Sequence, residues 1–266
     1  MLTVVFVDGH HKLIRWKLVT HAGIDGFSRM IVYLRCSSNN QAATVYHLFL
    51  QAVRRFSLPS RVRSDEGGEN RLVALHMIRH RGVQRRSMLV GSSVHNQRIE
   101  RLWRDLFQSI IRLYYRLFYF LEARGRLDPL NAIHLYSLHY VYLPRINHSL
   151  EEFQEGWNHH GIRTADSRSP YQIFTAGALQ LQQAGLHGLD FFHDVDDSYG
   201  LEELGLPPDD QTGEVNIAEV HFRLVDDDFR RLQQLVNPLQ ESHSYGTDLY
   251  GNTLHLLDFP LVSSLG

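Results

Sequence analysis

Three apolar runs rich in β-branched residues open the chain, and they most constrain how it can fold: residues 2–8, 14–25 and 29–36. Runs of this length and composition predict strands, and the tripeptide GFS between the last two predicts a hairpin. From Asn40 the apolar residues recur every three or four positions until Pro59, which predicts a helix. The chain therefore begins with three strands and then crosses over.

Strands and helices alternate after that first helix. Residues 60–64 predict a short strand that leads into a Gly-rich loop. Residues 70–80 predict a helix that stops at Gly82, and the run SMLVG predicts a short buried strand. These elements extend the sheet beyond the opening hairpin.

A long helix follows, and we expect it to begin near Ser93, with an apolar stripe from Ile99 to Leu117. Another helix follows Pro129, and residues 151–158 form a further helical stretch. The order of elements predicts an α/β fold with one mixed sheet, because the hairpin supplies antiparallel strands and the crossover helices supply parallel ones.

Charge is divided unevenly along the chain. Residues 1–175 carry 24 Lys and Arg against 13 Asp and Glu, whereas residues 176–266 carry 3 against 16. The stretch 188–214 is acidic and rich in Gly and Pro, as is typical of an extended linker. Beyond it, VHFRLV predicts a strand and DDDFRRLQQL a short helix. We therefore expect an acidic, partly ordered C-terminal extension over 179–266.

Composition excludes several classes of protein. The single cysteine, Cys36, rules out an internal disulfide framework and a cysteine-rich zinc site, and it fits a reducing compartment. No run of about eighteen apolar residues is present, so we expect no membrane span. Only Lys12 and Lys17 among the 27 basic residues are lysines, and guanidinium groups suit phosphate binding. Base composition of the gene is an equal alternative explanation of that bias.

Three carboxylates fall where this plan brings elements together. Asp8 ends the first strand, Asp65 ends the strand before the Gly-rich loop, and Glu100 lies near the start of the long helix. Strand ends and helix starts on one sheet edge can converge. Three such acids predict a site for two Mg²⁺ or Mn²⁺ ions, which prefer oxygen ligands and can activate a hydroxyl for attack on a phosphodiester.

The polar face of the long helix predicts contacts to nucleic-acid phosphates. Asn96, Gln97, Arg101 and Arg104 lie near Glu100 on a helical wheel, away from the apolar stripe. The structural alternative is that each acid is a turn residue or forms an ordinary surface ion pair, such as Glu100 with Arg104.

These motifs together resemble a known family. The set FVDGH, IDGFSRMIVYL, LPSRVRSDEGGEN and VHNQRIERLWRDL, closed by WNHHGIRTADSRSPYQIF, resembles the catalytic core of retroviral and retrotransposon integrases and related DDE transposases. Within that group it is similar to integrase core domain proteins derived from transposons in animal genomes. The resemblance covers about residues 1–175, so we expect an integrase-like core over 1–178.

The resemblance implies a ribonuclease H-like fold with a five-stranded mixed sheet flanked by helices. It implies that Asp8, Asp65 and Glu100 form the family triad, which uses Mg²⁺ or Mn²⁺ to cut and join DNA. It places Asn96 and Arg98 where integrases touch DNA. It also implies action as a homo-oligomer and a nuclear location, with the cytoplasm as the open alternative.

Two departures from the family pattern stand out. Integrases usually carry an upstream recognition domain, whereas only seven residues precede Asp8 here, so we expect recognition to lie elsewhere or upstream. The acidic extension differs from the basic tails of many integrases. It suggests self-masking of the basic face as a DNA mimic, or binding of a protein partner.

Two rival functions stay open beside DNA integrase or transposase chemistry. One is a catalytically silent, transposon-derived module that binds nucleic acid or protein, and the other is a nuclease on the same fold. The pair His76 and His80 has zinc-chelating spacing but no evident third ligand. His10 and His11 predict substrate contact or plain loop chemistry, and Trp103 predicts base stacking or core packing.

Overall fold

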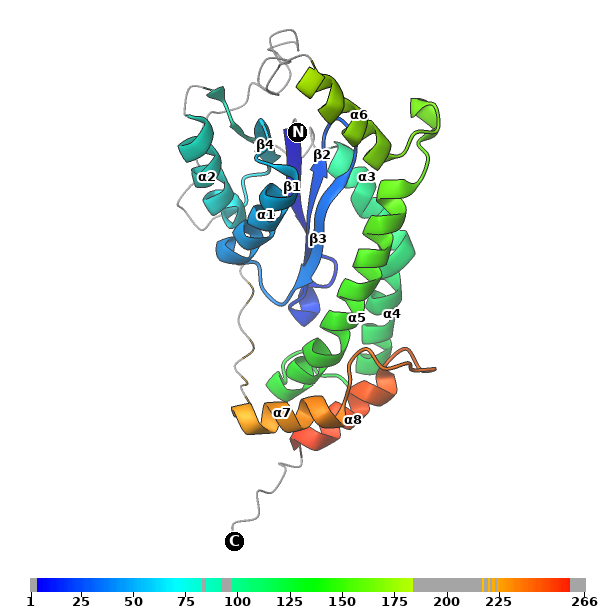
Figure 1. The fold of residues 1–266 in the computed structure, drawn as a ribbon. Helices are drawn as coiled ribbons and strands as arrows, with labels where there is room; N and C mark the ends of the chain where they lie inside the picture. Colours follow the sequence, from blue (N-terminus) through cyan, green and yellow to red (C-terminus); the bar gives the residue numbers. More distant parts are fainter. Residues whose placement is uncertain are drawn as a thin grey trace.

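A five-stranded mixed sheet organises the protein, with helices on both faces (Figure 1). The computed structural model describes residues 4–82, 85–91, 97–183 and 224–258, together with Ile217, Val220 and Phe222. The strand order is β3-β2-β1-β4-β5. This architecture confirms the predicted ribonuclease H-like α/β fold. The strands are β1 (Val4–His10), β2 (Val19–Asp25), β3 (Ile31–Ser37), β4 (Arg61–Ser64) and β5 (Met88–Val90).

Strand directions follow the predicted connections. β2 pairs antiparallel with β1 and, through the hairpin, with β3. After helical crossovers β4 joins β1, and β5 joins β4, in parallel register. The predicted second strand, 14–25, is too long, because Ile14–Trp16 form a 3-10 turn and Lys17 adopts a left-handed backbone with φ of 57°. That turn keeps the chain from entering the sheet before Val19.

The helices fall where the apolar periodicity predicts them. α3, a π-helical turn at Phe107–Ile111 and α4 follow one another without a break, which confirms the single long helix. α2 ends at Gly82, whose φ of 86° suits glycine. The helices are α1 (Ala42–Phe56), α2 (Arg71–Arg81), α3 (Gln97–Leu106), α4 (Arg112–Ala123), α5 (Ala132–His159), α6 (Pro170–Gln183), α7 (Asp226–Leu235) and α8 (Thr247–Asp258).

Each face of the sheet has its own hydrophobic core. Val5 and Val7 of β1 face α1 and α2, where they pack with residues such as Phe49 and Met77. The alternate position Phe6 packs against the other core, which α3, α4 and α5 form. Because side chains alternate along a strand, Asp8 shares the face of Phe6 and points toward α3.

Helix α5 covers the exposed edge of the sheet. Asn147 accepts a hydrogen bond from the Cys36 N–H at 2.8 Å and donates to the Cys36 carbonyl at 3.1 Å. Asn158 makes the same pair of bonds to Ile31. These amides satisfy backbone groups of β3 that an edge strand otherwise leaves free.

The structure joins two predicted helical stretches into one. We expected a helix after Pro129 and another over 151–158, but α5 is continuous and contains Pro144. Proline removes one backbone hydrogen bond and usually ends a helix. Here Val141 and Ile146 are fully buried on either side of it, so packing holds both halves in line.

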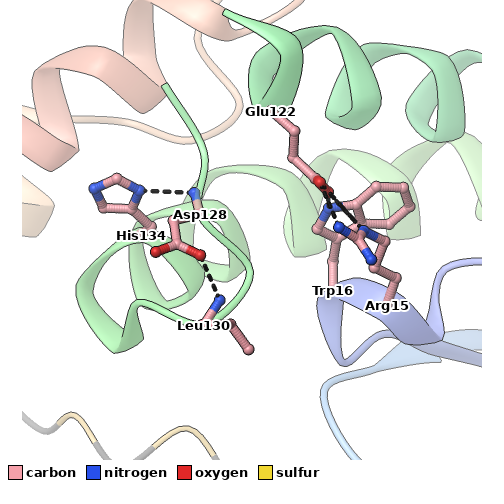
Figure 2. A network of polar contacts seen from close by, with 6 residues as sticks. All are labelled: Arg15, Trp16, Glu122, Asp128, Leu130 and His134. Carbon is pink, nitrogen blue, oxygen red and sulfur yellow. Dashed lines mark hydrogen bonds and ion pairs between the residues drawn. The ribbon is translucent and has the colours of Figure 1, made fainter. Parts of the chain in front are cut away.

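A second polar cluster ties the 3-10 turn before β2 to the end of α4 (Figure 2). The Glu122 carboxylate accepts from the Arg15 guanidinium at 2.7 Å and from the Trp16 indole N–H at 2.6 Å. Beside it, the Asp128 N–H donates to His134 Nδ1 at 2.9 Å in the loop between α4 and α5. The Arg15 bonds hold the pKa of Glu122 below its ordinary value.

The C-terminal helices pack onto the core rather than standing apart. Leu232 of α7 and Tyr250 of α8 belong to the same hydrophobic core as α4 and α5. The Tyr140 hydroxyl donates to the Val236 carbonyl at 2.7 Å. The predicted helix of this extension is confirmed as α7, and α8 was not predicted. No strand forms at the described Val220 and Phe222.

Two sequence interpretations of the extension meet limits in the structure. The boundary expected at residue 178 falls inside α6, which continues to Gln183. The acidic stretch 188–214, the basis for self-masking, lies outside the described residues. Among the described helices, none is long and apolar enough to span a membrane.

Candidate active site

Asp8 sits near the end of the central strand β1 with both carboxylate oxygens in hydrogen bonds. The Gly9 N–H donates to Oδ1 at 2.7 Å, and the Trp103 indole N–H donates to Oδ2 at 2.8 Å. Trp103 comes from α3, so the bond joins the sheet to the helix that carries Glu100. The side chain of Asp8 is therefore fixed in one orientation, and each oxygen keeps a lone pair free.

Burial raises the pKa of Asp8 to about 6, although the Trp103 bond opposes the rise. The negative charges of Asp65 and Glu100 raise the pKa further. Like charges act in this way only when they lie close together in a poorly solvated place. The fold thus brings both other predicted acids into the electrostatic neighbourhood of Asp8.

Asp65 follows β4 at the start of the Gly-rich loop. Its Oδ1 accepts from the Gly67 N–H at 3.3 Å and from the Asn70 side-chain amide at 3.2 Å. Because β4 pairs in parallel with β1, the ends of these strands meet at one edge of the sheet. The loop then turns into α2 and holds the carboxylate at that edge.

Glu100 lies in the first turn of α3 and is exposed to solvent. It precedes Trp103 by three residues, so both side chains lie on adjoining parts of one helix face. Within the described part of the chain, no three His, Cys, Asp or Glu side chains come close enough together to hold a metal ion. Asp8, Asp65 and Glu100 are electrostatically coupled carboxylates, and their role as a triad stays a prediction.

The predicted DNA-contact residues divide into two groups. Asn96 and the side chain of Gln97 lie outside the described residues. Arg98, Arg101 and Arg104 are all exposed on α3. Arg101 comes only within 3.9 Å of Asp105, the distance of a weak surface pair.

Three further side chains belong to this region: Trp103 bonds to Asp8, and His10 and His11 follow Asp8 closely in the chain. The sequence interpretation did not connect Trp103 with Asp8. Trp103 is buried in the hydrophobic core, which is one of the two roles predicted for it. Its indole N–H also donates a hydrogen bond to Asp8. The His10 ring lies 5.2 Å from the Trp103 ring, and burial lowers the pKa of His10 to about 4. The His11 ring folds over Gly9, where a β-carbon would lie 3.2 Å from it.

The charge of Asp65 acts on His11. Burial lowers its pKa, and the charge of Asp65 opposes that shift. Its Nε2 is buried and finds no partner among the described residues. Local sequence pattern gives no signal for the Trp103 contact, because it depends on how α3 packs against β1.

Other side chains of metal-ligating type make contacts of their own. Glu69 is buried in the 3-10 turn before α2, with its carboxylate folded against Gly67. His76 Nδ1 lies 3.0 Å from the Tyr46 hydroxyl, and its ring stacks on that of His80 at 4.0 Å. These contacts are those of a helix surface, with no third ligand among the described residues.

Comparison with known proteins places the chain in context. A sequence model described as "Integrase core domain" matches residues 3–187. The chain is similar to the HTLV-2 integrase catalytic core domain, solved in complex with magnesium in trimeric and dimeric forms. Both forms have 14% identity and a TM-score of 0.42, with 65% of this chain and 95% of the other covered.

A further similar structure is the simian T-cell lymphotropic virus intasome in complex with PP2A regulatory subunit B56 gamma. It has 13% identity and a TM-score of 0.42, with 65% of this chain and 54% of the other covered. Among curated proteins, none matches the sequence.

Proposed function

Because the chain belongs to the integrase core domain family, we propose that it is a polynucleotidyl transferase that cleaves and joins DNA strands with two divalent metal ions. The observation that carries this proposal is the position of Asp8, half-buried on the central strand and hydrogen-bonded to Trp103 of the helix that carries Glu100. Asp65 follows the neighbouring parallel strand β4, and the charges of Asp65 and Glu100 both raise the pKa of Asp8. A cation near these groups relieves their repulsion, so the donor set fits Mg²⁺ or Mn²⁺.

Asp8, Asp65 and Glu100 are the side chains that would hold the metal ions. Bound divalent ions supply activation of an attacking hydroxyl and stabilisation of the leaving oxygen in phosphodiester chemistry. The exposed position of Glu100, beside the half-buried Asp8, leaves one side of the set open to a nucleic-acid substrate.

The chain's own residues prepare the site. Trp103 and Gly9 fix the Asp8 carboxylate by one hydrogen bond to each oxygen. The Asn70 amide and the Gly67 N–H both donate to Oδ1 of Asp65. Fixed ligands lower the cost of assembling the site, because little rotamer freedom remains to be lost.

Arginines of α3 supply the contacts to DNA in this proposal. Arg98, Arg101 and Arg104 are exposed on the helix that carries Glu100, and the predicted contacts of Asn96 and Gln97 precede them. Guanidinium groups bind phosphate oxygens bidentately and position the backbone without reading sequence. We further propose that the protein acts as a homo-oligomer and in the nucleus, where its substrate lies.

Strand nicking and joining on duplex DNA with Mg²⁺ or Mn²⁺ tests the function. The wild type should produce both nicked and joined products, and Glu100→Gln should lose at least 100-fold in rate, of order 3 kcal/mol. Glu151→Gln is the matched control, since Glu151 is an exposed glutamate on α5 paired with Arg35. Equal rates for Glu100→Gln and the control would refute the proposal.

A second function is favoured by one observation. No three of the described ligand-type side chains yet converge on one ion position, which a catalytically silent DNA-binding protein also explains. Metal-independent DNA binding with no cleavage by the wild type supports that function. Cleavage without joining supports a nuclease.

A further inference from the structure

A row of exposed arginines continues along the long helix beyond the candidate active site. Arg101, Arg104, Arg112 and Arg116 are spaced three, eight and four residues apart, with Gln108 in the gap. Residues three or four apart share one face of a helix. The hydrogen bond from Arg112 to Gln108 at 3.2 Å keeps this face continuous across the π-helical turn Phe107–Ile111. All five side chains belong to exposed residues, opposite the buried positions that face the core. We call Arg101, Arg104, Arg112 and Arg116 the arginine stripe.

The positive charges of Arg112 and Arg116, the two arginines of the stripe farthest from Glu100, are not neutralised by nearby acids on the helix. The positions three and four residues from Arg112 and Arg116 hold no acid. Within the described part of the chain, no carboxylate forms an ion pair with either arginine, and Arg112 bonds only to Gln108, at 3.2 Å. Like charges one turn apart destabilise a helix, and a bound polyanion removes that repulsion.

The stripe has a defined position relative to Glu100. At the α-helical rise of about 1.5 Å per residue, Arg112 and Arg116 lie at most about 18 and 24 Å along the helix axis from Glu100, since the π-helical turn Phe107–Ile111 is more compact. Figure 1 shows this helix running from beside the sheet, through α3 and α4, to the C-terminal helices. A duplex that follows the helix advances about 3.4 Å per base pair, so these distances correspond to about five to seven base pairs.

Building on the proposed function, we infer that Arg112 and Arg116 bind phosphates of double-stranded DNA about five to seven base pairs from the phosphodiester that reacts near Glu100. The contact is electrostatic and independent of base sequence, since exposed guanidinium groups on a smooth helix face reach the backbone rather than base edges. This contact increases the affinity for the duplex beside the reacting phosphodiester and takes no part in the reaction itself.

Salt dependence of DNA binding provides the test. Affinity for a duplex of about 25 base pairs is measured by fluorescence anisotropy in EDTA between 50 and 200 mM salt. Each lost phosphate contact lowers the slope of log affinity against log salt by about 0.9, so Arg112→Gln with Arg116→Gln should lower it by about 1.8. The ratio of wild-type affinity to variant affinity then falls about twelvefold between 50 and 200 mM salt.

Two further variants separate the stripe from a general effect of charge. Arg112→Lys with Arg116→Lys keeps the charge and should keep most of the slope. Arg230→Gln with Arg231→Gln removes two exposed arginines of α7 and should leave the slope unchanged. Thermal unfolding of each variant, expected to match the wild type because all four positions are exposed, shows that the fold is intact.

The outcomes distinguish this inference from the function on which it rests. An equal slope for the stripe variant and the wild type overturns the inference alone. An equal loss in the α7 variant overturns it as well, because the effect would then follow net charge. A changed oligomeric state of the stripe variant at an unchanged slope assigns the stripe to a contact between copies. No duplex binding by the wild type overturns the proposed function and this inference together.

Discussion

Replacing Asp8 with asparagine should stabilise the protein at neutral pH in the absence of divalent metal. Burial raises the pKa of Asp8 from 3.8 to about 6, so the native state holds a proton that the unfolded chain has released between those values. Stability therefore falls as pH rises through this window. At 1.36 kcal/mol for each pKa unit, the native state above pH 6 carries a penalty of about 3 kcal/mol.

Asparagine removes that penalty, but it also removes a hydrogen bond. The amide presents one oxygen, whereas the carboxylate accepts from both Gly9 and Trp103, so one hydrogen bond of about 1 kcal/mol is lost. The expected net gain for Asp8→Asn is about 1–2 kcal/mol at pH 8. The gain should vanish or reverse near pH 4, where the wild-type carboxyl is protonated.

Urea denaturation in EDTA, followed by tryptophan fluorescence from pH 4.5 to 8, measures the difference. Asp166→Asn is the control, since Asp166 is exposed and should show no gain that grows with pH. Saturating Mg²⁺ should stabilise the wild type and not Asp8→Asn, because only the carboxylate binds the ion. A variant that is less stable than the wild type at every pH would refute the reasoning.

Three further perturbations probe contacts of the fold and the site. Asn147→Ala should lower the free energy of unfolding by about 2–4 kcal/mol, because it removes the side chain that bonds to the buried N–H and C=O of Cys36. The control Asn252→Ala, on the exposed face of α8, should change it hardly at all, and urea denaturation measures both. Glu122→Gln should cost about 1 kcal/mol at pH 7. The lowered pKa of Glu122 makes this cost shrink as pH falls below the ordinary value of 4.5 and disappear below the folded-state pKa, so a constant cost across pH would contradict the reasoning. Trp103→Phe should weaken Mn²⁺ binding about 10- to 100-fold in a calorimetric titration, and unchanged affinity would show that its N–H does not position Asp8.

Local pattern was enough to predict the sheet, because each strand depends mainly on its own β-branched run. The parallel and antiparallel directions followed from connection lengths, and the structure confirms them. Where tertiary packing overrides local preference, prediction was wrong. The left-handed Lys17 delays β2, and the core on both sides of Pro144 carries α5 through a residue that usually ends a helix.

The C-terminal helix α8 was missed for a related reason. Its sequence, TDLYGNTLHLLD, includes glycine and threonine and has little intrinsic preference for a helix. Leu249 and Tyr250 are buried against the core of α4 and α5, and that packing stabilises the helix. A contact between segments more than one hundred residues apart leaves no trace in local periodicity.

The candidate site divides in the same way. Asp8, Asp65 and Glu100 could be selected from the order of elements, since a strand end, a loop and a helix start have predictable places in this fold. The Trp103 bond to Asp8 and the fold of His11 over Gly9 depend on how α3 tilts against β1, which the sequence does not reveal. Predicting them required the angle between two elements.

A crystal structure of the protein soaked in Mn²⁺ tests the central claim most directly. Anomalous difference maps should show metal among Asp8, Asp65 and Glu100, with oxygen ligands at roughly 2.0–2.2 Å and a second ion about 3.5–4 Å from the first when DNA is bound. Asp65→Asn should lose the signal under the same conditions. Saturating Mn²⁺ with no peak among these carboxylates, or an unchanged peak in the variant, would contradict the account.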